Sequence, residues 1–469
     1  MGEKIVINPL TRISGFLEIE VYIENHIIKN AKSSGMLFRG FEKMLEGRPP
    51  LDAIYFTQRI CGICSTAHSI ASALALEDAL KVVPNENDRM IRDMIHGCEF
   101  LQNHLRHFYQ YTFPDYVKGP QINPLYKESH GDYRLPKIVD EKLSKHYIAS
   151  IEYSRQAHKM LAILGGKAPH NHGVFVGGVT VNMNASIFIE LKSIIASIKG
   201  FIENIMIEDV GIIAKYYSDY FHNGKGYGNF ISYGVFDDDY NAPFIYVKPA
   251  VLRNDKRYPF DDKKITENIY YAWYKADQVN ISPKEGYVET DRYKENAYSF
   301  IKAPRYDESP MEVGPLARLW LSGEYTRGVS TMDRTIARVL EAKKICNIIE
   351  NLLTKIRLGP SNQQRYEIPN RAYGIGLKGT TRGALGHWLF IENQKIKKYT
   401  IITPTSWNTS PMDSNGVKGV IEKALIGTYV KDVKNPVEVG RIVRSFDPCV
   451  SCATHIMSNK YNSMTIRIV

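Results

Sequence analysis

The stretch Arg59-Ile60-Cys61-Gly62-Ile63-Cys64 contains the first of two Cys-x-x-Cys pairs in this chain. The second pair lies in Asp447-Pro448-Cys449-Val450-Ser451-Cys452, close to the opposite end of the sequence. Because a Cys-x-x-Cys turn lets two thiolates face one ion, each pair is a candidate metal or redox site. Four thiolates together suit soft or borderline metals, which include zinc, nickel and the iron of iron–sulfur clusters.

The wide separation of the two pairs leaves three kinds of site open. Structural zinc pairs usually lie within one small module, whereas almost the whole chain separates these two. Two independent redox pairs are the second interpretation, and one catalytic metal site shared by both pairs is the third. The flanking residues favour the shared catalytic site, because His68, Asp447 and His455 are polar neighbours suited to orienting ligands. His68 follows Cys64 by one helical turn, which would return it to the same face, although a lone core histidine gives the same pattern.

The bulk composition is that of a globular protein rather than of a membrane or nucleic-acid-binding protein. The chain has 469 residues, 44% hydrophobic and 23% charged, which is enough for a sizeable core. The net charge of +10 comes from dispersed Lys and Arg, so we interpret it as a solvated basic surface and expect no nucleic acid as a partner. No apolar run is long enough for a transmembrane helix, and the first residues lack the apolar segment of a signal peptide. The remaining cysteines, Cys98 and Cys346, fall in helical patterns and are predicted to pack in the core.

Hydrophobic patterning predicts a mixture of strands and long helices. Residues 4–23 roughly alternate apolar and polar side chains, as strands do. Apolar residues recur at helical spacing in four longer segments, which are 51–82, 86–112, 185–218 and 330–358. The segment 223–310 is rich in Tyr, Asp, Gly and Pro, so it is predicted to be an irregular insertion of strands and loops. Because no segment has the composition of a flexible linker, we expect a single domain over residues 1–455.

With these motifs the chain resembles the large-subunit family of nickel–iron hydrogenases. The resemblance extends over essentially the whole chain, because blocks similar to the family follow one another in the family's order. The block around Gly314 most resembles the membrane-associated, respiratory uptake type. The matching blocks are Thr11 to Ile13, Arg39 to Glu42, Arg59 to Cys64, Asn103 to Tyr109, Gly165 to His170, Glu312 to Arg318, Arg382 to Trp388, Pro404 to Asn408 and Asp447 to His455.

This resemblance implies a fold, an activity and a set of cofactors. The implied fold is α+β and mainly helical, with a long central helix bundle flanked by small β-sheets. The implied activity is the reversible heterolytic cleavage of H2 to protons and electrons. Cys64 and Cys452 would bridge a nickel ion to an iron that carries carbon monoxide and cyanide ligands, Fe(CO)(CN)2. Cys61 and Cys449 would be terminal nickel ligands, and a terminal thiolate would take the proton.

The resemblance also implies roles for residues around the metals. Arg382 matches an active-site arginine that helps to polarise H2 and donates to a cyanide ligand, and Asp447 would hold it in place. Thr405 matches a donor to the other cyanide. A separate site for magnesium, or a similar divalent ion, would use the carboxylate of Glu42, the backbone carbonyl of Ile401 and the ring of His455. Oxygen ligands are the ones that Mg²⁺ prefers.

At one expected proton acceptor the chain departs from the family. The family usually has Arg-Ile-Glu-Gly-His in the N-terminal region, whereas this chain has Arg12-Ile13-Ser14-Gly15-Phe16. The hydroxyl of Ser14 cannot hold a proton as a carboxylate can, and would pass one on only by relay. Two smaller departures are Thr381 in place of a proline and Asn103 in place of an aspartate or similar residue. We therefore expect proton transfer to be slower than is usual in the family, without loss of activity.

The resemblance implies partners, a processing step and a location. Because electrons must leave a buried site, the partner would be an iron–sulfur small subunit and, through it, a membrane cytochrome. A maturation endopeptidase would remove residues 456–469 after His455, and nickel-insertion chaperones would load the site. The related uptake enzymes are exported with their small subunit, which predicts the extracytoplasmic face of the cell membrane, with the cytoplasm as the alternative.

Two other classes of protein compete with this interpretation. A metal-free relative, such as the hydrogenase-like subunit of respiratory NADH dehydrogenase, would lack the four cysteines, which are all present here. A structural zinc protein would use the same four thiolates. Metal analysis separates the second alternative from a hydrogenase, because only a hydrogenase would contain nickel and iron together.

Overall fold

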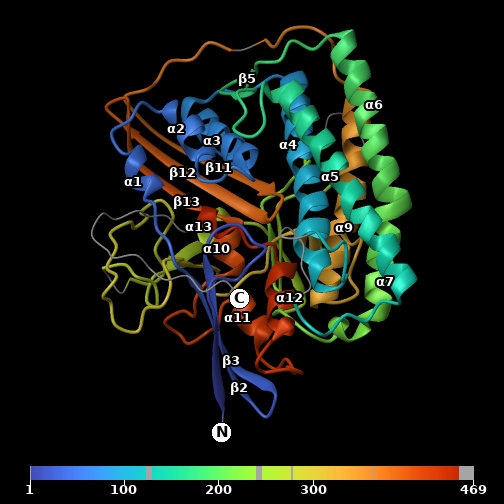
Figure 1. The fold of residues 1–469 in the computed structure, drawn as a ribbon. Helices are drawn as coiled ribbons and strands as arrows, with labels where there is room; N and C mark the ends of the chain where they lie inside the picture. The colour runs from blue at the N-terminus through green and yellow to red at the C-terminus, as the bar shows by residue number, and fades with distance from the viewer. Residues whose placement is uncertain (1, 123–128, 239–245, 276–277, 363, 454–469) are drawn as a thin grey trace.

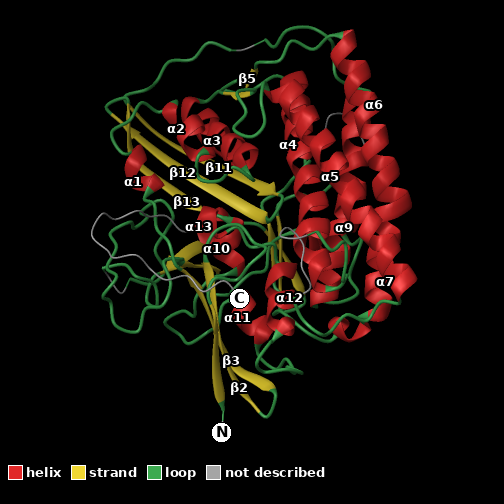
Figure 2. Cartoon of the chain, viewed as in Figure 1, coloured by secondary structure: helices red, strands yellow, loops and turns green. Residues whose placement is uncertain are grey.

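The computed structural model describes residues 2–122, 129–238, 246–275, 278–362 and 364–453. A bundle of long helices forms one half of the molecule, and a twisted sheet covered by two helices lies next to it (Figure 1). Smaller sheets and short helices extend from this pair of layers toward the N-terminus (Figure 2). The α+β fold, mainly helical with a helix bundle flanked by small sheets, is therefore confirmed.

The bundle is built from the segments in which apolar residues recur at helical spacing. Its helices are α4 (Glu86–Arg106), α5 (Lys137–Gly165), α6 (Ala185–Phe201), α7 (Ile207–Tyr216) and α9 (Thr331–Leu353). Side chains cap three of their starts: Asn85 accepts from the Asp88 N–H before α4, Asn184 accepts from the Ile187 N–H before α6, and Ser330 and Asp333 form a capping box before α9. The helices predicted over 86–112, 185–218 and 330–358 are thus confirmed. Two of them contain π-helical turns, η1 (His107–Thr112) and η3 (Ile202–Met206).

Helix α5 was not among the predicted helices, although it has 29 residues. Its buried side includes small or polar residues such as Ser150, Ser154 and Ala157, while Ile138 and Ile151 are exposed. The usual contrast between an apolar and a polar face is therefore weak along this helix. Small residues at these positions suit close packing between α5 and its neighbours α4 and α6.

The sheet next to the bundle packs against the two helices that lie before and after the first cysteine pair. Strands β11 (Arg371–Thr380), β12 (Gly383–Glu392) and β13 (Lys395–Ile402) pair antiparallel in that order. Helices α2 (Asp52–Gln58) and α3 (Ser65–Leu80), which form the predicted helical segment 51–82, lie over the sheet (Figure 2). Two glycines of β11 permit this contact, because a Cβ on Gly374 or Gly376 would lie 2.0 Å from a carbonyl oxygen of α3.

The N-terminal sheet packs against helices from the C-terminal part of the chain. Strands β1 (Glu3–Ile7), β2 (Leu17–Glu24) and β3 (Ile27–Gly35) are antiparallel, as the alternation over residues 4–23 predicted. Its buried side chains form a second core with α11 (Val420–Leu425) and α12 (Val437–Ser445). The loop between β1 and β2 therefore lies beside the C-terminal cysteine segment.

The remaining elements are short and connect these layers. In the segment 223–310, β6 (Phe230–Ser232), β7 (Ala250–Arg253) and β8 (Lys256–Pro259) form one sheet, and β9 (Ile265–Asn268) pairs with β10 (Ala303–Tyr306). The other elements are α1 (Phe41–Leu45), η2 (Phe113–Asp115), β4 (Val174–Phe175), β5 (Gly178–Val179), η4 (Ser218–Phe221), η5 (Asp262–Lys264), α8 (Pro315–Ser322), α10 (Pro404–Asn408) and α13 (Val450–Ala453). Every helix of the described residues is too short or too polar to span a bilayer. Cys98 and Cys346 are fully buried in the core, as predicted.

Candidate metal centre

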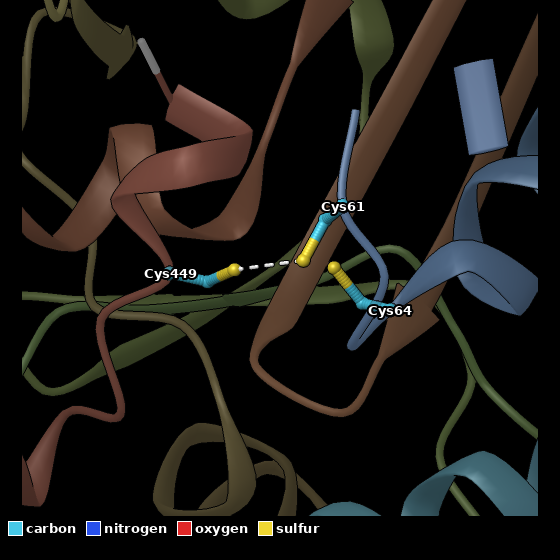
Figure 3. Close-up of side chains that lie close together, drawn as sticks. All are labelled: Cys61, Cys64 and Cys449. Carbon is cyan, nitrogen blue, oxygen red and sulfur yellow. Dashed lines mark hydrogen bonds between the residues drawn. The ribbon is translucent and has the colours of Figure 1, made fainter. Parts of the chain in front are cut away.

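Three of the four paired cysteines converge on one buried point. Cys61 lies in the turn after α2, Cys64 is the residue before α3, and Cys449 directly precedes α13 (Figure 3). The Sγ atoms of Cys61 and Cys449 are 3.3 Å apart, and all three sulfurs lie within 4.8 Å of one another. A metal bound by thiolates at about 2.3 Å holds its sulfurs roughly 3–4 Å apart. The three sulfurs are therefore spaced to bind one metal.

The fourth cysteine and the second histidine are only partly covered by the structure. Cys452 belongs to α13, one helical turn from Cys449, but its side chain lies outside the described part of the molecule. His455 lies beyond the described residues altogether. The expected fourth thiolate and the expected magnesium-binding ring stay predictions.

The loop after β1 fixes the backbone of Cys449. The N–H of Val450 donates to the carbonyl oxygen of Ser14 at 2.7 Å, and the N–H of Ser14 donates to that of Pro448 at 3.4 Å. Gly15 has φ +90°, and a Cβ there would lie 2.4 Å from the backbone nitrogen of Ser451. Glycine is thus required for the two segments to approach this closely. The hydroxyl of Ser14 lies 3.3 Å from that of Ser451, so Ser14 does stand beside Cys449.

A small cavity of about 10 Å³ lies next to the sulfurs. Arg382, in the turn between β11 and β12, lines it with a buried guanidinium. Its Nε is 3.0 Å from both the backbone oxygen and Oδ1 of Asp447, and one terminal nitrogen donates to Asn103 at 2.7 Å. The other terminal nitrogen, Nη1, has no hydrogen-bond partner among the described residues. A buried donor beside the thiolates is therefore available to an acceptor in the cavity.

The charges around Arg382 stabilise one another. Burial opposes the charge on the guanidinium, but Asp447 and the thiolates raise the pKa of Arg382 well above its usual value. Burial would likewise raise the pKa of Asp447, yet Arg382, His107 and Arg338 lower it to about 2. The amide of Asn103 donates to Asp447 Oδ2 at 2.8 Å and so joins the two groups. The site therefore holds a fixed cation next to its sulfurs.

Two further predicted residues line the same cavity. Burial lowers the pKa of His68 to about 4, so its ring is neutral at physiological pH. Its Nδ1 is 3.1 Å from His387 Nε2, and His387 Nδ1 is 2.8 Å from the hydroxyl of Tyr399. The hydroxyl of Thr405, which also lines the cavity, accepts from the N–H of Cys449 at 3.0 Å and has a proton of its own to donate.

The expected magnesium ligands Glu42 and Ile401 lie against each other. The N–H of Ile401 donates to Glu42 Oε1 at 2.8 Å, which is a different contact from the expected one through the carbonyl. The ammonium of Lys302 lies 3.8 Å from Glu42 and 3.2 Å from Glu267, and all three side chains are largely buried. Burial raises the pKa of both carboxyls, while Lys302 lowers it. This pocket is therefore built for oxygen ligands that face a cation.

Sequence reasoning missed several polar residues that surround the centre. Glu99 and His107 lie four residues before and after Asn103, which was noted only as a departure from the family; all three are buried on α4 or its π-helical extension, and Arg338 of α9 reaches the same cluster. Polar side chains at helical spacing within an otherwise apolar segment were the available signal. His387 was part of a matching block but had no assigned role.

Comparison with known proteins agrees with this geometry. The family model described as nickel-dependent hydrogenase matches residues 39–123, 118–329 and 321–455. The chain is 36% identical to the periplasmic [NiFeSe] hydrogenase large subunit of Desulfomicrobium baculatum, covering 97% of this chain and 95% of that protein. It is 30% identical to the uptake hydrogenase large subunit of Rhodobacter capsulatus, covering 97% and 96% respectively.

Solved structures give the same result for the fold. The structure of anaerobically purified D. baculatum [NiFeSe] hydrogenase superposes with a TM-score of 0.93 at 36% identity, over 97% of this chain and 100% of that one. The reduced Ni-Fe-Se hydrogenase of D. vulgaris Hildenborough superposes with a TM-score of 0.92, again at 36% identity. The chain therefore belongs to the nickel-dependent hydrogenase family, as a large, catalytic subunit of an oxidoreductase that acts on H2.

Proposed function

We propose that this chain cleaves H2 heterolytically, to protons and electrons, at a nickel–iron centre. The observation that carries the proposal is the convergence of three buried sulfurs beside a guanidinium nitrogen that has no hydrogen-bond partner in the part of the chain that the structure describes. Cys61 and Cys449 would be terminal nickel ligands, and Cys64 and Cys452 would bridge to an iron with carbon monoxide and cyanide ligands. When bound, the metals supply the Lewis acid and the redox centre that polarise H2.

The residues of the chain would then accept and relay the proton from H2 and set the charge of the cavity. A metal-bound thiolate is deprotonated, so the terminal sulfur of Cys61 or Cys449 can accept the proton from H2. Neutral His68 adds no charge to the cavity, and Ser14 offers a hydroxyl to relay a proton from Cys449 toward Ser451. Because a hydroxyl stores no proton, this route depends on continuous relay.

Arg382 and Thr405 would hold the diatomic ligands of the iron. Arg382 Nη1, which has no partner within the described ranges, and the hydroxyl of Thr405 both belong to side chains that line the cavity, so each can donate to one cyanide. Asp447 orients the guanidinium through its backbone and side-chain oxygens. Donors fixed in a water-poor pocket stabilise negative charge more strongly than donors in water.

We also propose the divalent-ion site at Glu42. The carboxylate of Glu42 and the backbone oxygen of Ile401 would be oxygen ligands for magnesium or a similar ion, and His455 would add its ring. The buried ammonium of Lys302 supports the proposal, because the pocket already stabilises positive charge beside two carboxyls. Mg²⁺ usually completes such a site with water.

The proposed enzyme works with partners. Relatives are named as large subunits, so an iron–sulfur small subunit would take the electrons, and a membrane cytochrome would receive them through it. Maturation would require nickel-insertion chaperones and an endopeptidase that removes residues 456–469. By analogy with the relative named periplasmic, we place the enzyme at the extracytoplasmic face of the membrane, with the cytoplasm as the alternative. Residues 1–455 would form one domain with 223–310 as an insertion.

Cys449→Ser, co-produced with the small subunit and the maturation factors, tests the function. We expect loss of H2-dependent dye reduction and a lower nickel content, because an alcohol is a poor ligand for nickel. Cys346→Ala is the matched control, since Cys346 is buried in the helix core, outside the metal centre. Metal analysis of the parent protein should find nickel and iron together, and zinc alone would contradict the proposal.

A further inference from the structure

The turn that carries Arg382 has a second polar side chain at the metal centre. Thr381 and Arg382 connect β11 to β12, and both side chains line the cavity beside the sulfurs. Thr381 is 1% exposed, and its hydroxyl oxygen is buried with no hydrogen-bond partner among the described residues. Nearly all buried polar groups have a partner, so an exception needs an explanation. Because Thr381 lines the cavity, we expect its partner to lie inside the cavity.

The backbone of this turn is held in place by a buried ion pair. The guanidinium of Arg318 donates to the backbone oxygens of Thr380 at 2.7 Å and of Thr381 at 3.3 Å. Arg318 is itself fixed by two contacts of 2.7 Å with the buried carboxylate of Glu341. Bidentate contacts of this kind are among the more rigid ones in proteins. The position of Thr381 beside the cavity is therefore fixed from the side that faces away from the metals.

The neighbouring hydroxyl shows what the turn itself can offer. Thr380 donates its hydroxyl proton to the backbone oxygen of Gly383 at 3.0 Å, across the same turn. The turn thus supplies an acceptor for Thr380 but none for Thr381 among the described residues. A buried donor without an acceptor lowers the stability of a protein. We therefore expect the acceptor of Thr381 to arrive with the group that fills the site.

The charge of the cavity indicates what kind of acceptor this is. Arg382 Nη1 also lacks a partner within the described ranges, so a cationic donor and a neutral donor belong to one cavity. Fixed donors beside a buried cation favour an acceptor that carries negative charge. Cyanide has such a charge and a lone pair on its nitrogen, whereas carbon monoxide is neutral and a poor acceptor.

We propose that the hydroxyl of Thr381 donates a hydrogen bond to a cyanide ligand of the iron, in addition to the donors Arg382 and Thr405. The inference rests on the proposed function. The family resemblance predicts a proline at this position, and proline has no hydroxyl, so this donor is a feature of the present chain. A hydrogen bond to cyanide withdraws electron density from the iron and in this way tunes the metal.

Infrared spectra of the complete heterodimer test the hydrogen bond through the stretching bands of the iron ligands. Thr381→Val removes the hydroxyl and keeps a similar shape, whereas Thr381→Ser keeps the hydroxyl. We expect the cyanide bands to shift in Thr381→Val by more than the carbon monoxide band, and to return toward their parent positions in Thr381→Ser. Thr335→Val is the matched control, because Thr335 is also buried and its hydroxyl donates to the backbone oxygen of Thr331 in α9. This control should leave all bands unchanged.

The stability of the full chain without metals gives a readout that needs no activity. Thr381→Val replaces an unpaired buried donor by an apolar group, so the equilibrium constant for unfolding should stay unchanged or fall by up to about fivefold. Thr335→Val removes a hydroxyl that has a partner and should not lower this constant. Urea unfolding compares both variants with the parent.

Three results would overturn the role of Thr381. They are unchanged bands in Thr381→Val, a shift that is largest for carbon monoxide, and an unfolding constant that rises in this variant. The second result would identify a thiolate as the acceptor, because carbon monoxide responds most strongly to electron density on the iron. The third would show that the hydroxyl has a partner within the protein.

The metal content of the variants completes the test. Loss of iron in Thr381→Val but not in Thr381→Ser would support the hydrogen bond, and loss in both variants would contradict it. Absence of carbon monoxide and cyanide bands in the nickel-loaded parent would instead overturn the proposed function.

Discussion

At the scale of single residues, the candidate metal centre depends on buried charges that hold one another in place. Arg382 is fixed by Asp447 and Asn103, and Asp115 joins the loop of Ser14 to the helix that precedes the second cysteine pair. Asp115 accepts from Arg12 at 2.6 Å and from Arg444 at 2.7 Å. A buried charge without its partner is costly, so each such contact determines local geometry as well as stability.

Arg382→Lys should reduce H2 oxidation by about 100-fold, the usual effect of losing a fixed donor in an active site. Lysine keeps the positive charge but cannot contact Asp447, Asn103 and the cavity at the same time. Dye-linked H2 oxidation measures the rate, and metal analysis measures cluster loading. Arg371→Lys, at an exposed position, is the control. Full activity in Arg382→Lys would show that a positive charge at this position is sufficient for H2 oxidation, without the contacts of the guanidinium.

Asp115→Asn should destabilise the chain by about 3–5 kcal/mol, because two arginines lose a buried counter-charge. Burial would raise the pKa of Asp115, but Arg12 and Arg444 hold it well below its usual range. A depressed folded pKa stabilises the protein above the unfolded pKa of about 3.9. The difference between parent and variant should therefore be constant from about pH 5 to 8 and shrink as the pH falls below about 4.

Urea unfolding of the metal-free chain at several pH values measures this difference. Asp219→Asn is the matched control, because Asp219 pairs with Arg134 while its side chain is 48% exposed. Exposed pairs contribute about 0–1 kcal/mol. An equal loss in both variants would argue against a special role for the buried cluster.

The candidate site residues that belong to short sequence motifs could be predicted from the sequence. The spacing of Cys61 and Cys64 marks a metal-binding or redox turn, and His68 follows at helical spacing. The contact of Glu42 with Ile401 came only from the family resemblance. The buried contact of Glu99 with the start of α3 was not found, because it depends on α4 and α3 lying side by side, a relation between distant segments that no local pattern contains.

At the scale of elements, α3 is held against β11 by backbone contact rather than by large side chains. Gly376 faces the carbonyl of Ala71, and Gly374 faces that of Ala75. The helix start is therefore fixed to the sheet from which Arg382 extends. The first cysteine pair and the guanidinium of Arg382 are therefore both positioned by the contact between α3 and β11.

Gly376→Ala should destabilise the chain by at least about 1–3 kcal/mol, as overpacking does. The added Cβ would lie 2.0 Å from a backbone oxygen of α3, so the helix has to move and carry Cys64 and His68 with it. Urea unfolding measures the loss, and nickel content should fall in parallel. Gly211→Ala, in α7 with no atom within 4 Å of the new Cβ, should be neutral or stabilising by up to about 1 kcal/mol. An equal loss of stability in Gly376→Ala and Gly211→Ala would contradict the close approach of β11 to α3.

Elements with a clear periodicity were predictable, and the others were not. Helices α4 and α9 bury apolar stripes next to side-chain caps, which a sequence displays directly. Strand β12 is buried on both faces over most of its length, so it lacks the alternation that marks a strand. Helix α5 buries several small or polar residues and exposes Ile138 and Ile151, which weakens the usual contrast between its faces.

At the scale of the whole molecule, the metal centre joins the two ends of the chain. Cys61 and Cys449 are 388 residues apart in sequence and 3.3 Å apart in space. Apart from the metals, Arg39 links these ends, because its guanidinium donates to the backbone oxygens of Ile60 and Ser451, and the loop of Ser14 and Gly15 packs against the Cys449 segment. Metal binding should therefore tighten this junction more than any other part of the fold.

Removal of the metals should loosen the junction selectively. We expect the amide of Val450, which donates to Ser14 at 2.7 Å, to exchange with solvent at least about tenfold faster, equal to about 1.4 kcal/mol of local stability. Hydrogen exchange with mass spectrometry compares the loaded and metal-free protein. Amides in the centre of β12 serve as the internal control. A uniform increase over the whole chain would mean that the metals stabilise the fold globally.

The sequence separation of 388 positions between Cys61 and Cys449 also sets the order of events in biosynthesis. At about 5–20 residues per second, a ribosome needs roughly 20–80 s to make the second pair after the first has emerged. During that interval the nascent chain presents two thiols without their partners, open to oxidants and to any thiophilic ion in the cell. Nickel delivery to the proposed site of four thiolates would therefore have to follow translation.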